Sequence, residues 1–331
     1  MTLQKKLDDI LKSFRQKKIL IVGDVMVDEY LWGDVTRISP EAPVPVVSCT
    51  RREYRMGGAA NVTINVASMK AESVLCSVIG NDDAGKIFRQ LLHARKMSDE
   101  GIIESPKRIT SFKTRVIGNH QQLLRVDHEI TSFLDTELET RLLQKVEELF
   151  NNVTFDAVIF QDYDKGILTK KIIEGVTSMA SKRGIHTLVD PKKRSFLIYS
   201  NVTFFKPNHK ELCEGLKHAI SKDDIKELMQ AANLLHKKNE IQSVMVTLSE
   251  KGVFISDGKN CKIIPAIERD IADVSGAGDT VICIAALCLA TGLDAFQTAE
   301  LANLAGGIVC EKVGVVPITP ELLLHEKANL I

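Results

Sequence analysis

The sequence of 331 residues has no excess of charge of either sign, because 43 Lys and Arg residues balance 43 Asp and Glu residues. Such a chain has no overall field that attracts nucleic acid or an anionic membrane, so an anionic ligand must be held by a local site. The seven cysteines lie far apart and form no CxxC pair, as is typical of reduced thiols in the cytoplasm. We therefore expect a cytoplasmic protein whose partner is a small molecule rather than nucleic acid or a membrane.

Long hydrophobic runs are absent as well. The longest purely apolar stretch, residues 281–290, is about half the ~20 residues that a membrane-spanning helix needs. Charged and apolar residues alternate at helical spacing near the N-terminus, unlike the apolar segment of a secretory signal. Since 44% of the residues are nevertheless apolar, the chain is expected to bury a large core.

Several phosphate-binding motifs are missing. The sequence contains no GxxxxGK[ST] loop, no HRD or DFG pair and no GxGxxG after a strand. These absences exclude the P-loop and protein-kinase forms of phosphoryl transfer. The eight histidines lack the spacing of a metal site, and we assign none of them a catalytic role.

Short continuous apolar runs alternate with helix-period segments. The runs begin near residues 17, 73, 156, 186 and 243. Continuous apolar runs are typical of strands buried on both faces, so the pattern predicts an α/β fold with a mainly parallel sheet flanked by helices. Residues 280–290 and 294–311 predict two strongly apolar helices that pack on this sheet.

Two segments break this rhythm. Residues 30–50 contain three prolines and several β-branched residues, and residues 110–128 alternate polar and apolar side chains around Gly118-Asn119. We interpret both as a small β-sheet that projects from the body as a lid. No internal repeat or low-complexity linker is present, so residues 1–331 are expected to form a single domain with a discontinuous lid.

The clearest motif is the run Gly276-Ala277-Gly278-Asp279, directly before a long apolar helix. Small residues at a helix start let backbone N–H groups approach an anion, as phosphate sites require. A carboxylate among such amides is useful if it deprotonates an attacking hydroxyl. The alternative is an ordinary helix start in which Asp279 interacts with the helix dipole.

A second glycine motif, Gly57-Gly58, is followed by two alanines and Asn61. It leaves room for a ligand against the backbone, with Asn61 offering a donor and an acceptor to a polyol, although close helix-to-strand packing explains it equally well. The first predicted strand is followed by Asp24 and Asp28, where an open parallel sheet tends to hold its ligand. Either aspartate alternatively caps a turn.

These motifs, in this order, resemble the ribokinase (phosphofructokinase-B-like) family of carbohydrate kinases over nearly the whole chain, from Gly23 to about Pro320. Residues 57–61 are similar to the N-terminal signature of the family, and residues 273–280 to its DTxGAGD signature, with Val274 as a variant. The resemblance implies a ribokinase-like fold and ATP-dependent phosphorylation of a sugar hydroxyl with Mg²⁺, and it allows for a monovalent cation.

The resemblance also implies roles for individual residues. Asp279 is the expected general base, with residues 276–278 as the amides that bind the transferred phosphoryl group. Asp28, Gly57, Gly58 and Asn61 are the expected sugar-binding residues. Asn208 and Glu211 are similar to an NxxE element that holds hydrated Mg²⁺, Glu211 acting through water, and an N-terminal capping box is compatible with that role. The other expected nucleotide-binding residues are Lys192, Thr247, Ser249, Gly252 and Asn303.

Longer runs, at residues 37–46, 113–116 with 121–127, and 162–166, are most similar to kinases of D-glycero-D-manno-heptose 7-phosphate, which supply ADP-heptose for the lipopolysaccharide core. They suggest Arg37, Gln121, Arg125 and Lys165 as further substrate-binding residues, although a solvated surface explains each charge singly. Two residues depart from the pattern: Asp164 replaces a small residue, and Lys70 replaces a glycine. Without an HxGH motif, the chain resembles a stand-alone kinase rather than one fused to an adenylyltransferase.

Two other functions remain open from the sequence. One is phosphorylation of another sugar, such as fructose, ribose or a ketose phosphate, by the same residues. The other is a non-catalytic sugar or nucleotide sensor, which would be expected to lose the base or crowd the phosphoryl site. Because exposed strands of the lid need covering, we also expect a homodimer that pairs through the lid.

Overall fold

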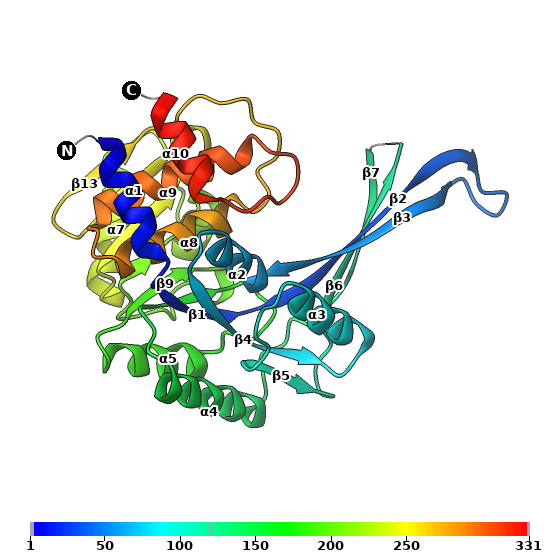
Figure 1. Ribbon diagram of the computed structural model, residues 1–331, viewed down its shortest axis with the longest axis horizontal. Coiled ribbons are helices and arrows are strands. Elements are labelled where there is room, and N and C mark those ends of the chain that lie inside the picture. The colour runs from blue at the N-terminus through cyan, green and yellow to red at the C-terminus, as the bar shows by residue number, and fades with distance from the viewer. Residues whose placement is uncertain (1–2, 120, 330–331) are drawn as a thin grey trace.

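The computed structural model describes residues 3–119 and 121–329. Figure 1 shows a layered α/β body from which a small β-sheet projects to one side. Within the described residues, the main sheet has nine strands in the order β13-β12-β11-β10-β9-β8-β1-β4-β5. Their bounds are β1 Lys18–Gly23, β4 Glu72–Gly80, β5 Ile102–Ser105, β8 Ala157–Gln161, β9 His186–Asp190, β10 Phe204–Phe205, β11 Ser243–Thr247, β12 Val253–Ser256 and β13 Cys261–Ile264.

The sheet is parallel from β5 to β11, and only β12 and β13 run antiparallel to their neighbours. The sequence of strand β1 is continuously apolar because both faces of the strand are buried. Ile19 and Ile21 face one core, while Leu20 and Val22 face the other. Helices therefore have to cover both faces. The mainly parallel sheet flanked by helices confirms the predicted fold class.

Two layers of helices cover the sheet. One core contains residues of α1 Leu3–Phe14, α2 Ala59–Ser68, α3 Asp83–Ala94, α8 Ala277–Ala290, α9 Ala295–Cys310 and α10 Pro320–Asn329. The other contains residues of α4 Thr136–Asn152, α5 Lys170–Ser181, α6 His209–Leu216 and α7 Ile225–Asn239. The predicted apolar helices correspond to α8 and α9. Across the described part of the chain, no helix is both long and apolar enough to cross a membrane.

The small sheet has the strand order β3-β2-β6-β7. Its strands are β2 Val25–Ile38, β3 Pro45–Gly58, β6 Ser111–Gly118 and β7 Gln121–His128. Strand β2 pairs antiparallel with β3 and parallel with β6, and β6 pairs antiparallel with β7. The sheet extends further along the chain than the predicted residues 30–50, since β2 begins at Val25 and β3 runs to Gly58. The Gly57-Gly58 pair therefore lies where this sheet joins the body, directly before α2.

Candidate active site

The start of helix α8 lies beside the carboxyl ends of β8 and β9. Gly276 precedes the helix with φ +82°, in the region that favours glycine, and a Cβ there would lie 2.9 Å from Val315 Cγ1. The Ala277 amide donates to the Val274 carbonyl at 3.3 Å. Among the described residues, the amides of Gly278 and Asp279 have no hydrogen-bond acceptor, as expected for the first turn of a helix. These two N–H groups remain available to an anion.

Asp279 is 6% exposed and accepts three hydrogen bonds from side chains. Asn61 Nδ2 donates to its Oδ2 at 2.6 Å, while Gln161 Nε2 and the Tyr163 hydroxyl donate to its Oδ1 at 3.0 and 2.8 Å. Burial raises the pKa of Asp279 to about 6, and the bonds from Asn61 and Tyr163 oppose that rise. Asp279 is thus a buried carboxylate that is ionised at neutral pH, as a general base must be.

A buried ion pair borders the start of α8. Lys206 and Asp190 are 2% and 4% exposed, and Lys206 Nζ lies 3.1 Å from Asp190 Oδ1. A Cβ on Gly278 would lie 3.6 Å from each of the two charged groups, so both approach the predicted phosphoryl site. Lys206 lowers the pKa of Asp279 and Asp190 raises it. Sequence reasoning did not identify this pair.

These groups share one cavity of about 200 Å³. It brings Asp279, Gly276 and Gly278 together with most of the residues expected to bind the nucleotide. Its lining consists of Tyr163, Asp190, Lys192, Lys206, Asn208, Glu211, Thr247, Gly276, Gly278 and Asp279.

Each oxygen of the Glu211 carboxylate has one partner at the edge of this cavity. Its Oε2 accepts from the Asn208 backbone N–H at 2.8 Å, and Asn208 Oδ1 accepts from the Glu211 N–H at 2.8 Å, which is the capping box suggested by the sequence. Its Oε1 pairs with Lys192 Nζ. Burial would lower the pKa of Lys192, but the carboxylates of Asp190 and Glu211 outweigh it and raise that pKa. Within the described residues no cluster of three His, Cys, Asp or Glu side chains could hold a metal ion, so the donors present fit Mg²⁺ only through water and ligand phosphates.

Three softer nucleotide-site predictions lie outside the cavity lining. Ser249 is exposed in the 3₁₀ turn Ser249–Lys251, and Asn303 Nδ2 donates to the Pro265 carbonyl at 2.9 Å. Gly252 has φ +86°, and a Cβ there would lie 2.1 Å from the Ile264 carbonyl oxygen. The glycine is therefore explained by the tight turn between β11 and β12.

Of the residues expected to bind the sugar, Asp28 lies on β2 with its carboxylate beside Gly57. A Cβ on Gly57 would be 2.3 Å from Asp28 Oδ2, and Gly58 has φ +63°, so this approach of strand and carboxylate requires glycine. Asp28 Oδ1 accepts from Arg115 Nη1 at 2.5 Å. Asn61, in the first turn of α2, reaches Asp279. The two glycine motifs therefore meet through the Asn61–Asp279 hydrogen bond.

The remaining predicted substrate residues lie on or near the small sheet. Lys165 Nζ pairs with Glu129 Oε1 at 2.7 Å, and Arg125 Nε pairs with Asp127 Oδ1 at 2.9 Å. Arg37 is exposed, nine residues along β2 from Asp28, which at ~3.3 Å per residue is about 30 Å. Gln121 is exposed at the start of β7, opposite Gly118. Within one protomer, the structure does not bring Arg37 or Gln121 together with Asp279.

Asp24 has the structural role that the sequence left open. It is 1% exposed, and its carboxylate accepts from the backbone N–H groups of Tyr163, Lys165 and Ile167 at 2.8, 3.1 and 3.0 Å. It thereby holds the loop after β8. Asp164, which stands where the resembling kinases have a small residue, lies in that loop. Its φ of +57° is in the left-handed region. Lys70, the other departure, has φ +67° after α2.

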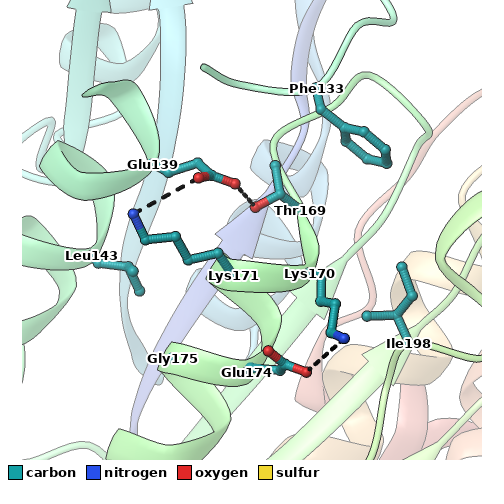
Figure 2. A pocket seen from close by; sticks show the side chains of 9 residues that line it. All are labelled: Phe133, Glu139, Leu143, Thr169, Lys170, Lys171, Glu174, Gly175 and Ile198. Carbon is teal, nitrogen blue, oxygen red and sulfur yellow. Dashed lines mark hydrogen bonds and ion pairs between the residues drawn. The ribbon is translucent and has the colours of Figure 1, made fainter. Parts of the chain in front are cut away.

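A larger cavity of about 710 Å³ lies between α4 and α5, and none of its lining residues belongs to the Asp279 cavity (Figure 2). Its charged side chains are paired with one another. Lys170 Nζ lies 3.7 Å from Glu174 Oε1, and Lys171 Nζ lies 3.8 Å from Glu139 Oε2. None of the residues predicted to bind sugar or nucleotide lines this cavity.

The layered α/β body and the projecting small sheet define a protein of the ribokinase-like fold. Phosphofructokinase-2 from Escherichia coli superposes with a TM-score of 0.76 over 95% of this chain and 99% of that one, at 17% identity. Ribokinase from Arabidopsis thaliana, solved with ribose and ATP, gives 0.70 over 94% and 98%, at 16% identity. At such low identity these likenesses show the fold alone.

Comparison with known sequences shows the family as well as the fold. Residues 16–322 match the model of the pfkB family carbohydrate kinases. The chain is 37% identical to the bifunctional protein HldE of Pelobacter propionicus over 98% of its own length and 66% of that protein, and 40% identical to HldE of Magnetococcus marinus over 92% and 63%. The chain belongs to the pfkB family of carbohydrate kinases, for which ATP is the implied co-substrate. It spans about two thirds of the length of these bifunctional relatives.

Proposed function

We propose that this protein transfers the γ-phosphoryl group of ATP to the anomeric hydroxyl of D-glycero-D-manno-heptose 7-phosphate, a step toward ADP-heptose for the lipopolysaccharide core. The observation that carries the kinase chemistry is the buried Asp279 carboxylate beside two unpaired amides at the start of α8. The choice of heptose 7-phosphate is supported by the runs at residues 37–46, 113–116, 121–127 and 162–166 and by similarity to HldE proteins over most of the chain.

The geometry suggests a separate role in the reaction for each group of the cavity. Asp279 takes the proton of the acceptor hydroxyl, and the N–H groups of Gly278 and Asp279 stabilise charge that grows on the phosphoryl oxygens. Lys206 and Lys192 add positive charge at the same cavity. Magnesium, when bound with ATP, neutralises phosphate charge, and Glu211 would contact it through water. The small sheet acts as a lid that excludes water, which otherwise competes with the sugar as acceptor.

The face of the small sheet that carries Asp28 favours a phosphorylated acceptor. Residues that pair directly across strands share a face, so the strand registers place the charged side chains around Asp28. In the segments 28–32, 51–55, 113–115 and 125–129, five cations on this face exceed four anions. The cations are Arg51, Arg55, Lys113, Arg115 and Arg125, and the anions are Asp28, Glu53, Asp127 and Glu129, which pairs with Lys113. A sugar phosphate fits such a surface better than a neutral sugar.

We also propose that the lid pairs across a homodimer. Strand β7 is an edge of the small sheet and is exposed along its whole length. Leu123, Leu124 and Val126 on it are 42%, 56% and 50% exposed. An uncovered edge with apolar side chains invites pairing with a second copy. Light scattering that shows only monomer at working concentrations would reject the dimer.

Finally, we propose that the protein works in the reducing cytoplasm. All seven cysteines are free, and Cys76, Cys283 and Cys288 are buried. Burial raises the pKa of the Cys76 thiol to about 12, so this thiol stays protonated and unreactive.

The acceptor is tested by coupled ADP release with magnesium-ATP. Heptose 7-phosphate is compared with fructose, fructose 6-phosphate and ribose at equal concentrations. Turnover at least tenfold faster on the heptose phosphate supports the proposal. Turnover on another sugar alone retains the kinase and discards the heptose assignment, and nucleotide binding without turnover on any of them favours the sensor.

A further inference from the structure

We propose that Tyr163 is a positioning residue: its hydroxyl fixes one oxygen of the Asp279 carboxylate, so that the other oxygen receives the proton of the acceptor. The inference rests on the proposed function only in taking Asp279 as the base.

The two oxygens of Asp279 are not equivalent. Oδ1 accepts two hydrogen bonds, from the Tyr163 hydroxyl at 2.8 Å and from Gln161 Nε2 at 3.0 Å, whereas Oδ2 accepts one, from Asn61 at 2.6 Å. An ionised carboxylate offers about two acceptor positions on each oxygen. Oδ1 is therefore filled, and Oδ2 keeps one free position. The acceptor hydroxyl must donate to Oδ2.

Both the backbone and the ring of Tyr163 have contacts of their own. Its backbone N–H donates to the buried Asp24 carboxylate at 2.8 Å, which ties the residue to the end of β1. Lys192 Nζ lies 5.7 Å from the centre of its ring. The hydroxyl thus reaches Oδ1 from a fixed backbone, and a phenylalanine at this position retains the backbone bond to Asp24 and the ring contact with Lys192 while it loses the hydrogen bonds of the hydroxyl.

The hydroxyl also sets the proton affinity of the base. Its hydrogen bond favours the ionised carboxylate and lowers the pKa of Asp279 against the effect of burial. Burial and the Asp279 charge raise the pKa of Tyr163 well above its usual range, so the phenol remains a donor. Without the hydroxyl, Oδ1 regains a free position and the carboxylate binds a proton more tightly.

The test compares Tyr163→Phe with Tyr199→Phe. Tyr199 is a buried tyrosine whose hydroxyl, like that of half-buried Tyr163, donates to a buried carboxylate, Asp162 Oδ2 at 3.0 Å, but it does not contact Asp279. The acidic limb of the kcat/KM profile is measured for both with the sugar that the wild type phosphorylates. For Tyr163→Phe the limb should move up by about one pH unit, the size expected for one hydrogen bond to a charged group. The KM for ATP should stay within about twofold, and Tyr199→Phe should leave the limb in place.

An unmoved limb in Tyr163→Phe, or an equal shift in both variants, would overturn the proposal. Infrared titration gives the same answer without any acceptor, by following the carboxyl band that Asp279→Asn removes. A raised pKa in Tyr163→Phe alone supports the positioning role even if the heptose assignment fails. An unchanged pKa contradicts the role even if the heptose assignment holds.

Discussion

Replacing Lys206 by methionine should destabilise the fold far more than its single ion pair suggests. Lys206 and Asp190 are almost completely buried, so neither charge is screened by solvent. Removing the ammonium leaves the Asp190 carboxylate with one remaining side-chain donor, Gln161 Nε2 at 3.3 Å. A buried charge left without its partner typically costs about 3–5 kcal/mol of unfolding free energy, whereas a solvated pair contributes less than about 1.

The double variant Lys206→Met with Asp190→Asn separates charge from packing. The neutral amide removes the uncompensated charge and can still accept from Gln161. We expect the double variant to recover more than half of the stability that the single variant loses. Turnover should not recover, because the cation beside Gly278 is still missing.

Urea unfolding at pH 7.5, followed by circular dichroism, gives the stabilities, and coupled ADP release gives the turnover. A loss below 1 kcal/mol in Lys206→Met, or a double variant as unstable as the single one, would refute the argument from burial. Recovery of full turnover in the double variant would show that the Lys206 charge has no part in catalysis.

Three further predictions concern pH and glycine. The pKa of Asp279 is raised from 3.8 to about 6, so the folded state binds this proton more tightly than the unfolded state does. Relative to Asp279→Asn, wild-type stability should fall by about 2.4 kcal/mol between pH 4 and 7, while kcat/KM rises through pH 6. Urea titrations of both proteins across that range check the sign, and a rise would contradict it. Gly252→Ala should cost at least about 2 kcal/mol more than Gly184→Ala, because both glycines have positive φ but only the first meets backbone within 4 Å; equal losses would show that φ alone matters. Gly57→Ala should raise the KM for sugar at least tenfold with little change in the KM for ATP, since its Cβ would displace Asp28, and an unaltered sugar KM would count against Asp28 as a ligand.

Much of the fold could be predicted because each central strand is apolar on both sides. Strand β1 shows this directly, with alternate residues in two different cores. The extent of the small sheet was harder to predict, since residues 51–55 are mostly charged and carry no apolar alternation. Their pairing with β2 is set by tertiary contacts rather than by local pattern.

The candidate site likewise contains residues that the sequence predicts and residues that it does not. The Gly276–Asp279 run and the Asn208–Glu211 capping box are local motifs, so the sequence alone indicates them. Gln161, Asp190 and Lys206 come from separate strands and meet only because β8, β9 and β10 are neighbours in the sheet. Their one sequence signal is a polar residue at or just after the end of an apolar strand, at the edge where parallel sheets bind ligands. No local sequence pattern predicts the order of the strands in the sheet, and this order is what brings the three residues together.

The central claim is that Asp279 is the general base, and Asp279→Asn tests it most directly. Single-turnover phosphorylation is measured at pH 7.5 with saturating magnesium-ATP and the best acceptor, and nucleotide affinity is measured separately by calorimetry. We predict a rate about 10² to 10⁴-fold lower, the usual contribution of a general base, with nucleotide affinity within a few-fold of wild type. A variant that phosphorylates the sugar at nearly the wild-type rate would contradict the account.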